Sequence, residues 1–136
     1  MMATPGKYGR ITGLVLHVLL GGLMSLAGVM KLAGMMPPEA TQKMPAGIAG
    51  HLKLIGGGEL VTAILLIVPL TSSLGVLLAS GFWGGVICIH MAQGEDILVP
   101  SVCLLLTWVG AWLRDPNVLY SFMTHPARQA APVTEG

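Results

Sequence analysis

Four long apolar segments dominate this chain and restrict the folds open to it. They cover residues 11–32, 48–70, 73–90 and 97–113. Each is close to the length of about 20 residues with which a helix crosses the hydrocarbon core of a bilayer. None alternates polar and apolar residues as a membrane strand does. The pattern predicts an all-α fold, an integral membrane four-helix bundle with antiparallel up-down spans.

The composition points to the same class of protein. Of the 136 residues, 54% are hydrophobic and 10% are charged, whereas soluble domains carry about 25% charged residues. A domain this small leaves much of its surface exposed and cannot hide so many apolar side chains. The net charge of +1 gives no electrostatic footprint for nucleic acid. The predicted surroundings are therefore the lipid bilayer.

The sequence predicts a single four-span transmembrane domain over residues 1–116. Residues 117–136 form a C-terminal tail whose polar, Ala- and Pro-rich end predicts partial disorder. The first apolar segment also has the basic residues and small-residue site of a signal peptide. We favour a retained helix, because His17 interrupts its apolar region.

The connections differ in length. Residues 33–47 form the only long internal loop, which Pro37 and Pro38 should keep stiff and non-helical. Pro69 should end the second helix, and the short turn Thr71–Ser73 predicts a tight hairpin between the second and third spans.

The distribution of lysine and arginine predicts the orientation. Four spans place both termini on one side of the membrane, and the side richer in these residues is usually cytoplasmic. The side of the termini carries Lys7, Arg10, Arg114 and Arg128, and the other side carries Lys31, Lys43 and Lys53. Both termini are therefore predicted to be cytoplasmic.

Small residues spaced four apart predict where the helices pack, because they let helix backbones approach closely in lipid. The candidate packing positions are Gly21 and Ser25, Gly58 and Thr62, and Gly81 and Gly85. A homodimer through the last pair is as compatible with the sequence as a contact with another membrane protein.

Four polar side chains in the apolar segments are candidates for ligand binding or for buried polar contacts: Glu59, His17, Trp83 and His90. A charged Glu59 in mid-membrane costs roughly 2.5 to 3.5 kcal/mol, so it should face the bundle interior. We expect it to meet His17 or the indole N–H of Trp83.

Helical periodicity extends this prediction. One stripe of the first helix holds His17, Gly21, Met24, Gly28 and Lys31. At the end away from the termini, the mouth of a cavity should gather Lys31, His51, Lys53, His90, Glu95 and Asp96.

Several functions fit such a cavity. It could bind a small molecule or quinone, relay protons or electrons in a redox complex, or hold Cu(I) through histidine and methionine. A purely structural Glu59 that joins helices fits equally well. No His-x-x-His or paired cysteine fixes a metal geometry, and Cys88 and Cys103 are interpreted as small apolar residues. We therefore predict no metal, and no definite cofactor beyond a candidate quinone.

Four stretches give the chain a family likeness. The segments "GRITGLVLHVLLGGLMSLAGVMKLAG", "HLKLIGGGELVTAILLIVPL", "GFWGGVICIHM" and "WVGAWLRDP" together resemble the DoxX-like membrane proteins over residues 9–116. The resemblance implies a four-helix bundle of the bacterial inner membrane. It also implies recurring polar points at Glu59, His90 and Arg114-Asp115. Some members are linked to quinone-coupled sulfur oxidation or oxidative-stress complexes. The absence of a redox dithiol from this sequence argues against a thiol oxidoreductase.

These observations favour an accessory or partner-binding subunit of a membrane complex, including a redox complex, over an enzyme. Its partner would be another membrane protein or a second copy, and its Glu59 cavity would hold lipid or quinone. The alternative is a small membrane oxidoreductase or quinone-interacting enzyme in which Glu59 transfers protons with His17 or His90.

Overall fold

The computed structural model describes residues 6–117, and this part of the chain is helical without any strand. Its four long helices are α1 (Lys7–Leu32), α4 (Leu52–Ile67), α5 (Ser72–Gln93) and α6 (Leu98–Arg114). The short α2 (Pro38–Lys43), α3 (Ala46–Ala49) and the 3-10 turn Pro69–Thr71 lie between them. The predicted tail beyond Asn117 lies outside the described residues.

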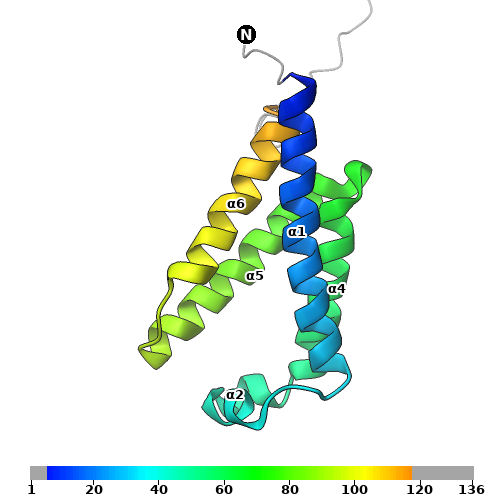
Figure 1. Cartoon of the computed structure of the whole chain (residues 1–136). Helices are drawn as coiled ribbons and strands as arrows, with labels where there is room; N and C mark the ends of the chain where they lie inside the picture. Colours follow the sequence, from blue (N-terminus) through cyan, green and yellow to red (C-terminus); the bar gives the residue numbers. More distant parts are fainter. Residues whose placement is uncertain (1–5, 118–136) are drawn as a thin grey trace, which may run out of the picture.

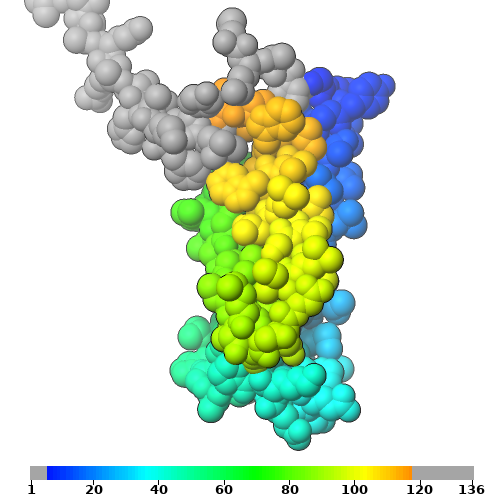
Figure 2. Space-filling model, turned by 90° about the vertical axis from the view of Figure 1, so that its left-hand side faces the viewer, coloured from blue at the N-terminus to red at the C-terminus, as the bar shows by residue number. Residues whose placement is uncertain are grey.

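The four long helices form two pairs that diverge toward one end. α1 packs against α4 and α6, and α5 packs against the same two helices. α1 begins at the end where α6 finishes, and α5 and α6 lean away from α1 and α4 toward the opposite end (Figure 1). There the segment that contains α2 covers the end of the bundle, below α5 and α6 in Figure 2. This divergence makes room for the cavity described below.

The second apolar segment is not one continuous helix, as its prediction over residues 48–70 implied. The chain breaks after α3, and α4 then ends at Ile67 because Pro69 lacks the N–H that the next turn needs. The predicted non-helical stretch after Pro37 is also wrong. α2 begins at Pro38, since proline suits the first position of a helix, where its missing N–H has no partner to lose.

The inward stripe predicted for α1 is buried in the structure. His17, Gly21, Met24 and Gly28 all lie in the bundle interior. Apolar side chains from α4 and α5 meet this stripe, and the core includes Leu20, Met24, Ala63, Leu66, Val76 and Ala79. The 3.6-residue period of the sequence therefore located the inner face of α1 correctly.

Close helix contacts depend on glycines that lack the predicted spacing. A Cβ added at Gly28 would lie 2.7 Å from the carbonyl oxygen of Gly56, and one at Gly13 would lie 2.6 Å from that of Gly110. A Cβ at Gly75 would overlap the backbone of Leu66. These glycines join α1 to α4, α1 to α6, and α5 to α4.

The predicted packing positions have mixed outcomes. Gly21 does face α4, and Thr62 is buried with its hydroxyl bonded to the carbonyl of Gly58. Ser25 is half-buried. A Cβ at Gly58, Gly81 or Gly85 would meet nothing within 4 Å in the described chain. Within the described chain these three glycines contact no other helix. A contact of Gly81 and Gly85 with a second copy or another membrane protein stays a prediction.

Candidate functional site

A buried ion pair joins α1 to α4 near the end of the bundle that carries α2. The ammonium of Lys31 donates to both carboxylate oxygens of Glu59, at 2.6 and 2.8 Å. The side chain of Glu59 is 1% exposed and that of Lys31 is 13% exposed. The two charges therefore neutralise each other, and the pair fixes one helix against the other.

The Gly28–Gly56 contact brings these two side chains together. A Cβ at Gly56 would lie 2.9 Å from the Cβ of Lys31, and a Cβ at Gly28 would lie 3.3 Å from the Cβ of Glu59. The helices run antiparallel, so Lys31 and Glu59 lie about one turn apart along the axis. The long, flexible side chain of lysine spans that turn.

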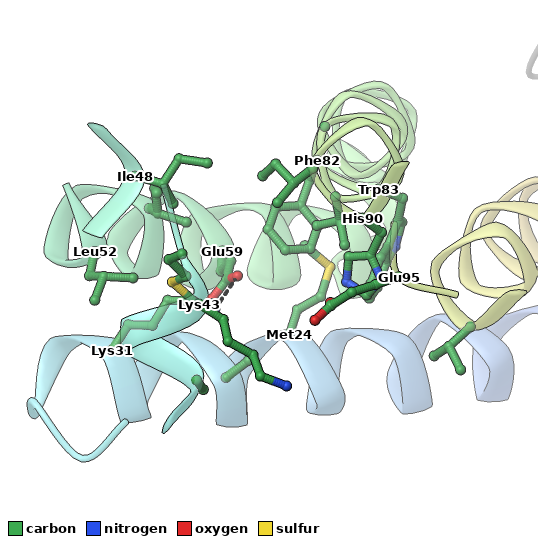
Figure 3. A pocket seen from close by; sticks show the side chains of 18 of the residues that line it. Met24, Lys31, Lys43, Ile48, Leu52, Glu59, Phe82, Trp83, His90 and Glu95 are labelled. Atoms are coloured by element: carbon green, nitrogen blue, oxygen red, sulfur yellow. Dashed lines mark hydrogen bonds and ion pairs between the residues drawn. The ribbon is translucent and has the colours of Figure 1, made fainter. Parts of the chain in front are cut away.

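A cavity of about 870 Å³ lies beside the ion pair, between the diverging helix pairs. Figure 3 shows Glu59, Lys31 and Met24 in its wall, with Phe82 and Trp83 of α5 across from them. Most of its lining is apolar. This volume is near the upper end of the roughly 300–1,000 Å³ typical of small-molecule sites.

Trp83 contributes its ring to the cavity wall. The residue is 7% exposed, and its ring packs edge-on against Phe82 with centroids 5.0 Å apart. Its indole nitrogen has no hydrogen-bond partner and is closed off from solvent. The expected bond from this nitrogen to Glu59 is therefore absent, and the cavity meets an aromatic surface at this position.

Polar side chains stand at the rim of the cavity. The Nδ1–H of His90 donates to the carbonyl of Asp96 at 2.8 Å, and Glu95 lies 3.9 Å from the same nitrogen. Gly94 ends α5 with φ +68°, and the N–H of Glu95 turns back to the carbonyl of His90. Gln93, the last residue of α5, donates a hydrogen bond to the carbonyl of Lys43, the last residue of α2. This bond holds α2 against α5.

A second polar cluster lies at the opposite end of the bundle. A guanidinium only donates hydrogen bonds, so Nδ1 of His17 accepts from Arg114 at 2.7 Å. The Nε2–H of His17 then donates to the carbonyl of Thr107 at 3.0 Å. Gly110 leaves space for the ring, because a Cβ there would lie 2.6 Å from Cδ2 of His17.

Arg114 also completes the end of α4. The last carbonyls of a helix lack partners within it. Arg114 donates to the carbonyl of Leu66 at 2.8 Å, with a longer contact of 3.5 Å to that of Ile67. The hydroxyl of Thr71 donates to the carbonyl of Leu65 at 3.1 Å. Side chains thus replace the donor that Pro69 removes.

We expect Arg114→Met to lower the stability of the bundle by roughly 1–3 kcal/mol, the cost of leaving a buried polar group without its partner. Arg114→Lys should recover only part of this loss, because lysine lacks the planar fork of donors. Thermal unfolding in detergent measures the effect. Arg10→Met removes an exposed arginine from the same end and serves as the control. Equal melting temperatures for the two methionine variants would contradict this role of Arg114.

The structure separates the four predicted site residues into two groups. Glu59, Trp83 and His90 line the cavity, whereas His17 belongs to the cluster around Arg114. The expected Glu59–His17 pair does not form, because each side chain has a nearer partner of its own.

Only some of the polar side chains predicted to gather at the mouth of the cavity lie there. Lys31, His90 and Glu95 line the cavity, but His51 and Lys53 line a smaller hollow of about 480 Å³. Asp96 contributes its backbone carbonyl to His90. Within residues 6–117, no three histidine, cysteine, aspartate or glutamate side chains lie together as a metal site would require.

Sequence reasoning missed Lys31 as the partner of Glu59. The signal was present, because Lys31 follows Gly28 by three positions and Glu59 follows Gly56 by three. Recognising it required knowing that these two glycines face each other. Arg114 was a candidate polar site only through the family resemblance, and nothing in the sequence linked it to His17.

Two helical segments of the described chain are long and apolar enough to cross a membrane, Lys7–Leu32 and Pro69–Gln93. α6 is apolar but shorter. Comparison of the chain with protein-family models, with curated proteins and with solved structures gives no match.

Proposed function

We propose that this chain is an integral membrane protein with four spans that binds an apolar membrane ligand, a lipid or a quinone, as an accessory subunit. The outward faces of all four long helices support the spans. They expose large apolar side chains, including Leu19, Leu26, Ile64, Leu77 and Leu105, each more than half exposed. Apolar surface on this scale is rare in soluble monomers and suits contact with lipid.

The two polar clusters fit such a placement. His17 and Lys31 are 14 positions apart on α1, about 21 Å at the helical rise of 1.5 Å per residue. The core between them is apolar. The clusters would therefore lie toward the two faces of a hydrocarbon layer about 30 Å thick. The lysine and arginine distribution supports a cytoplasmic location for the end at which α1 begins and α6 ends.

The DoxX-like resemblance supports a location in the bacterial inner membrane and a role beside a partner. Glu59 and His90, two of the family's recurring points, both line the cavity. Arg114, a third, caps α4 from the opposite cluster. The partner would be another membrane protein or a second copy of this chain.

The cavity beside the ion pair is the single observation that carries the ligand-binding proposal. An open cleft of about 870 Å³ with mostly apolar walls leaves those side chains without the close contacts that apolar groups have in a packed interior. An apolar ligand would fill it and restore the lost contacts.

The geometry favours ligand binding over the oxidoreductase alternative. Both oxygens of Glu59 already accept from Lys31, and His17 lies in the other cluster. His90 donates to a backbone carbonyl. A proton relay needs a carboxylate and a base within hydrogen-bond reach of one another, and neither histidine stands in that relation to Glu59.

Gly81 and Gly85 offer a direct test of ligand binding. Both line the cavity, and a Cβ at either would meet nothing within 4 Å. Gly81→Leu with Gly85→Leu should therefore narrow the cavity without disturbing a helix contact. The expected result is loss of the lipid or quinone that stays with the purified protein after a delipidating wash, measured by extraction and mass spectrometry.

Gly84→Leu is the matched control for this experiment. Gly84 lies on the same helix and has no atom within 4 Å of an added Cβ, but it does not line the cavity. Its variant should retain the ligand of the unaltered protein. A protein that carries no ligand at all, or equal retention in both variants, would contradict the proposed function.

A further inference from the structure

We infer that the occupant of the cavity is a phospholipid of the surrounding bilayer with a zwitterionic head group, whose acyl chain enters across Gly81 and Gly85 of α5. This inference rests on the proposed function and specifies its ligand. Three features carry it: exposed apolar residues of α5 beside the cavity, a rim that bears both signs of charge, and an ion pair that leaves only one donor free.

We place the opening along α5. Gly81 and Gly85 line the cavity and are exposed. Their neighbours Leu77 and Leu78 are exposed apolar residues on the same helix. In a membrane this stretch faces hydrocarbon. A chain can therefore pass from the bilayer into the cavity without crossing water.

The rim matches a head group that carries both charges. Glu39 and Lys43 of α2 and Glu95 beyond α5 all line the cavity and are exposed. Glu95 lies apart from the Lys31–Glu59 pair in Figure 3. The carboxylates suit the ammonium of a zwitterionic lipid, and the lysine suits its phosphate. The rim has one negative charge in excess, which disfavours an anionic head group.

The interior favours a lipid chain over a quinone ring. A quinone ring needs donors for its carbonyl oxygens. Two of the three N–H donors of Lys31 are held by the oxygens of Glu59, and the indole N–H of Trp83 is closed off. This leaves one lysine donor in the interior wall for the two carbonyl oxygens of a quinone. The remaining wall is mainly hydrocarbon and aromatic, which suits a methylene chain.

Tryptophan fluorescence can report entry of the chain. The chain has three tryptophans, and Trp112 is exposed on α6, where any surrounding lipid would quench it. The variant Trp108→Phe/Trp112→Phe leaves Trp83, which is shielded by the bundle but lines the cavity. This protein is reconstituted in nanodiscs that contain a phospholipid with a brominated acyl chain, a contact quencher of indole.

We expect brominated phosphatidylcholine to quench Trp83. Adding Gly85→Leu should abolish most of that quenching, and adding Gly84→Leu should leave it unchanged. Brominated phosphatidylglycerol should bind more weakly by roughly fivefold, the factor that one unit of net charge at about 4 Å produces in water. Glu39→Gln together with Glu95→Gln should remove this preference.

The outcomes separate this inference from the proposed function. Equal quenching in the Gly85→Leu and Gly84→Leu proteins, or tighter binding of phosphatidylglycerol, would overturn the inference. So would a purified protein that retains only quinone, although the proposed function would then stand. If the purified protein retains neither lipid nor quinone, the proposed function itself fails.

Discussion

Gly75→Ala is expected to destabilise the bundle more than any other single methyl group added to this chain. The new Cβ would overlap the backbone of Leu65 and Leu66, which cannot move aside as a flexible side chain can. Overpacking of this kind typically costs 1–3 kcal/mol and occasionally more. We expect about 3 kcal/mol, because α5 would have to shift away from α4 near their shared turn. Unfolding in a denaturing detergent series measures the loss.

Gly84→Ala is the matched control. It adds the same methyl group to the same helix at a position with nothing within 4 Å. Because alanine is the better helix former by up to about 1 kcal/mol, this variant should be neutral or slightly more stable. If both variants unfold alike, the close approach of α4 and α5 at Gly75 is not present in the protein.

Lys31→Met is expected to cost about 3–5 kcal/mol, because it leaves the carboxylate of Glu59 buried without its partner. Glu59→Leu alone should cost less. Lys31 is the more exposed member of the pair, and a lysine near a helix end can extend its ammonium toward water. The double variant Lys31→Met/Glu59→Leu should recover most of the loss, since an apolar pair of similar volume needs no charge partner. The free energies of unfolding of the unaltered protein, the two single variants and the double variant complete this double-mutant cycle.

Glu59→Gln separates the structural role of this residue from a proton relay. Glutamine keeps the shape of the side chain and accepts a hydrogen bond from Lys31, but it does not titrate. We expect ligand retention to survive Glu59→Gln and to fall with Glu59→Leu. If glutamine and leucine abolish function equally while the fold persists, the relay is favoured. If Lys31→Met leaves the stability of the protein unchanged, the ion pair has no structural role.

The predicted glycine motifs illustrate the limit of sequence patterns. Gly81 and Gly85 have the spacing of a helix-packing motif, yet they border the cavity. Gly28 and Gly56 lie on different helices and share no local pattern, yet they set the closest approach of α1 and α4. Spacing within one helix shows that small residues share a face. It does not show which face meets a neighbour.

The polar residues show the same limit. Burial of Glu59 followed from its place in an apolar segment, because a lone charge there must face the bundle interior. Its partner depended on the register of α1 against α4. That register placed Lys31 beside Glu59. The packing of α1 against α6 placed His17 beside Arg114, about 21 Å away along α1. A shift of one helical turn in the register of α1 against α4 would have separated Lys31 from Glu59.

The sequence by itself determined the helical class, the long apolar helices and the inner face of α1, because hydrophobic period and proline position act within one segment. Only the tertiary structure decided which glycines touch, which charge neutralises Glu59, and that the helix pairs diverge around a cavity. Those features depend on contacts between residues far apart in the chain, where backbone approach is set by all four helices at once.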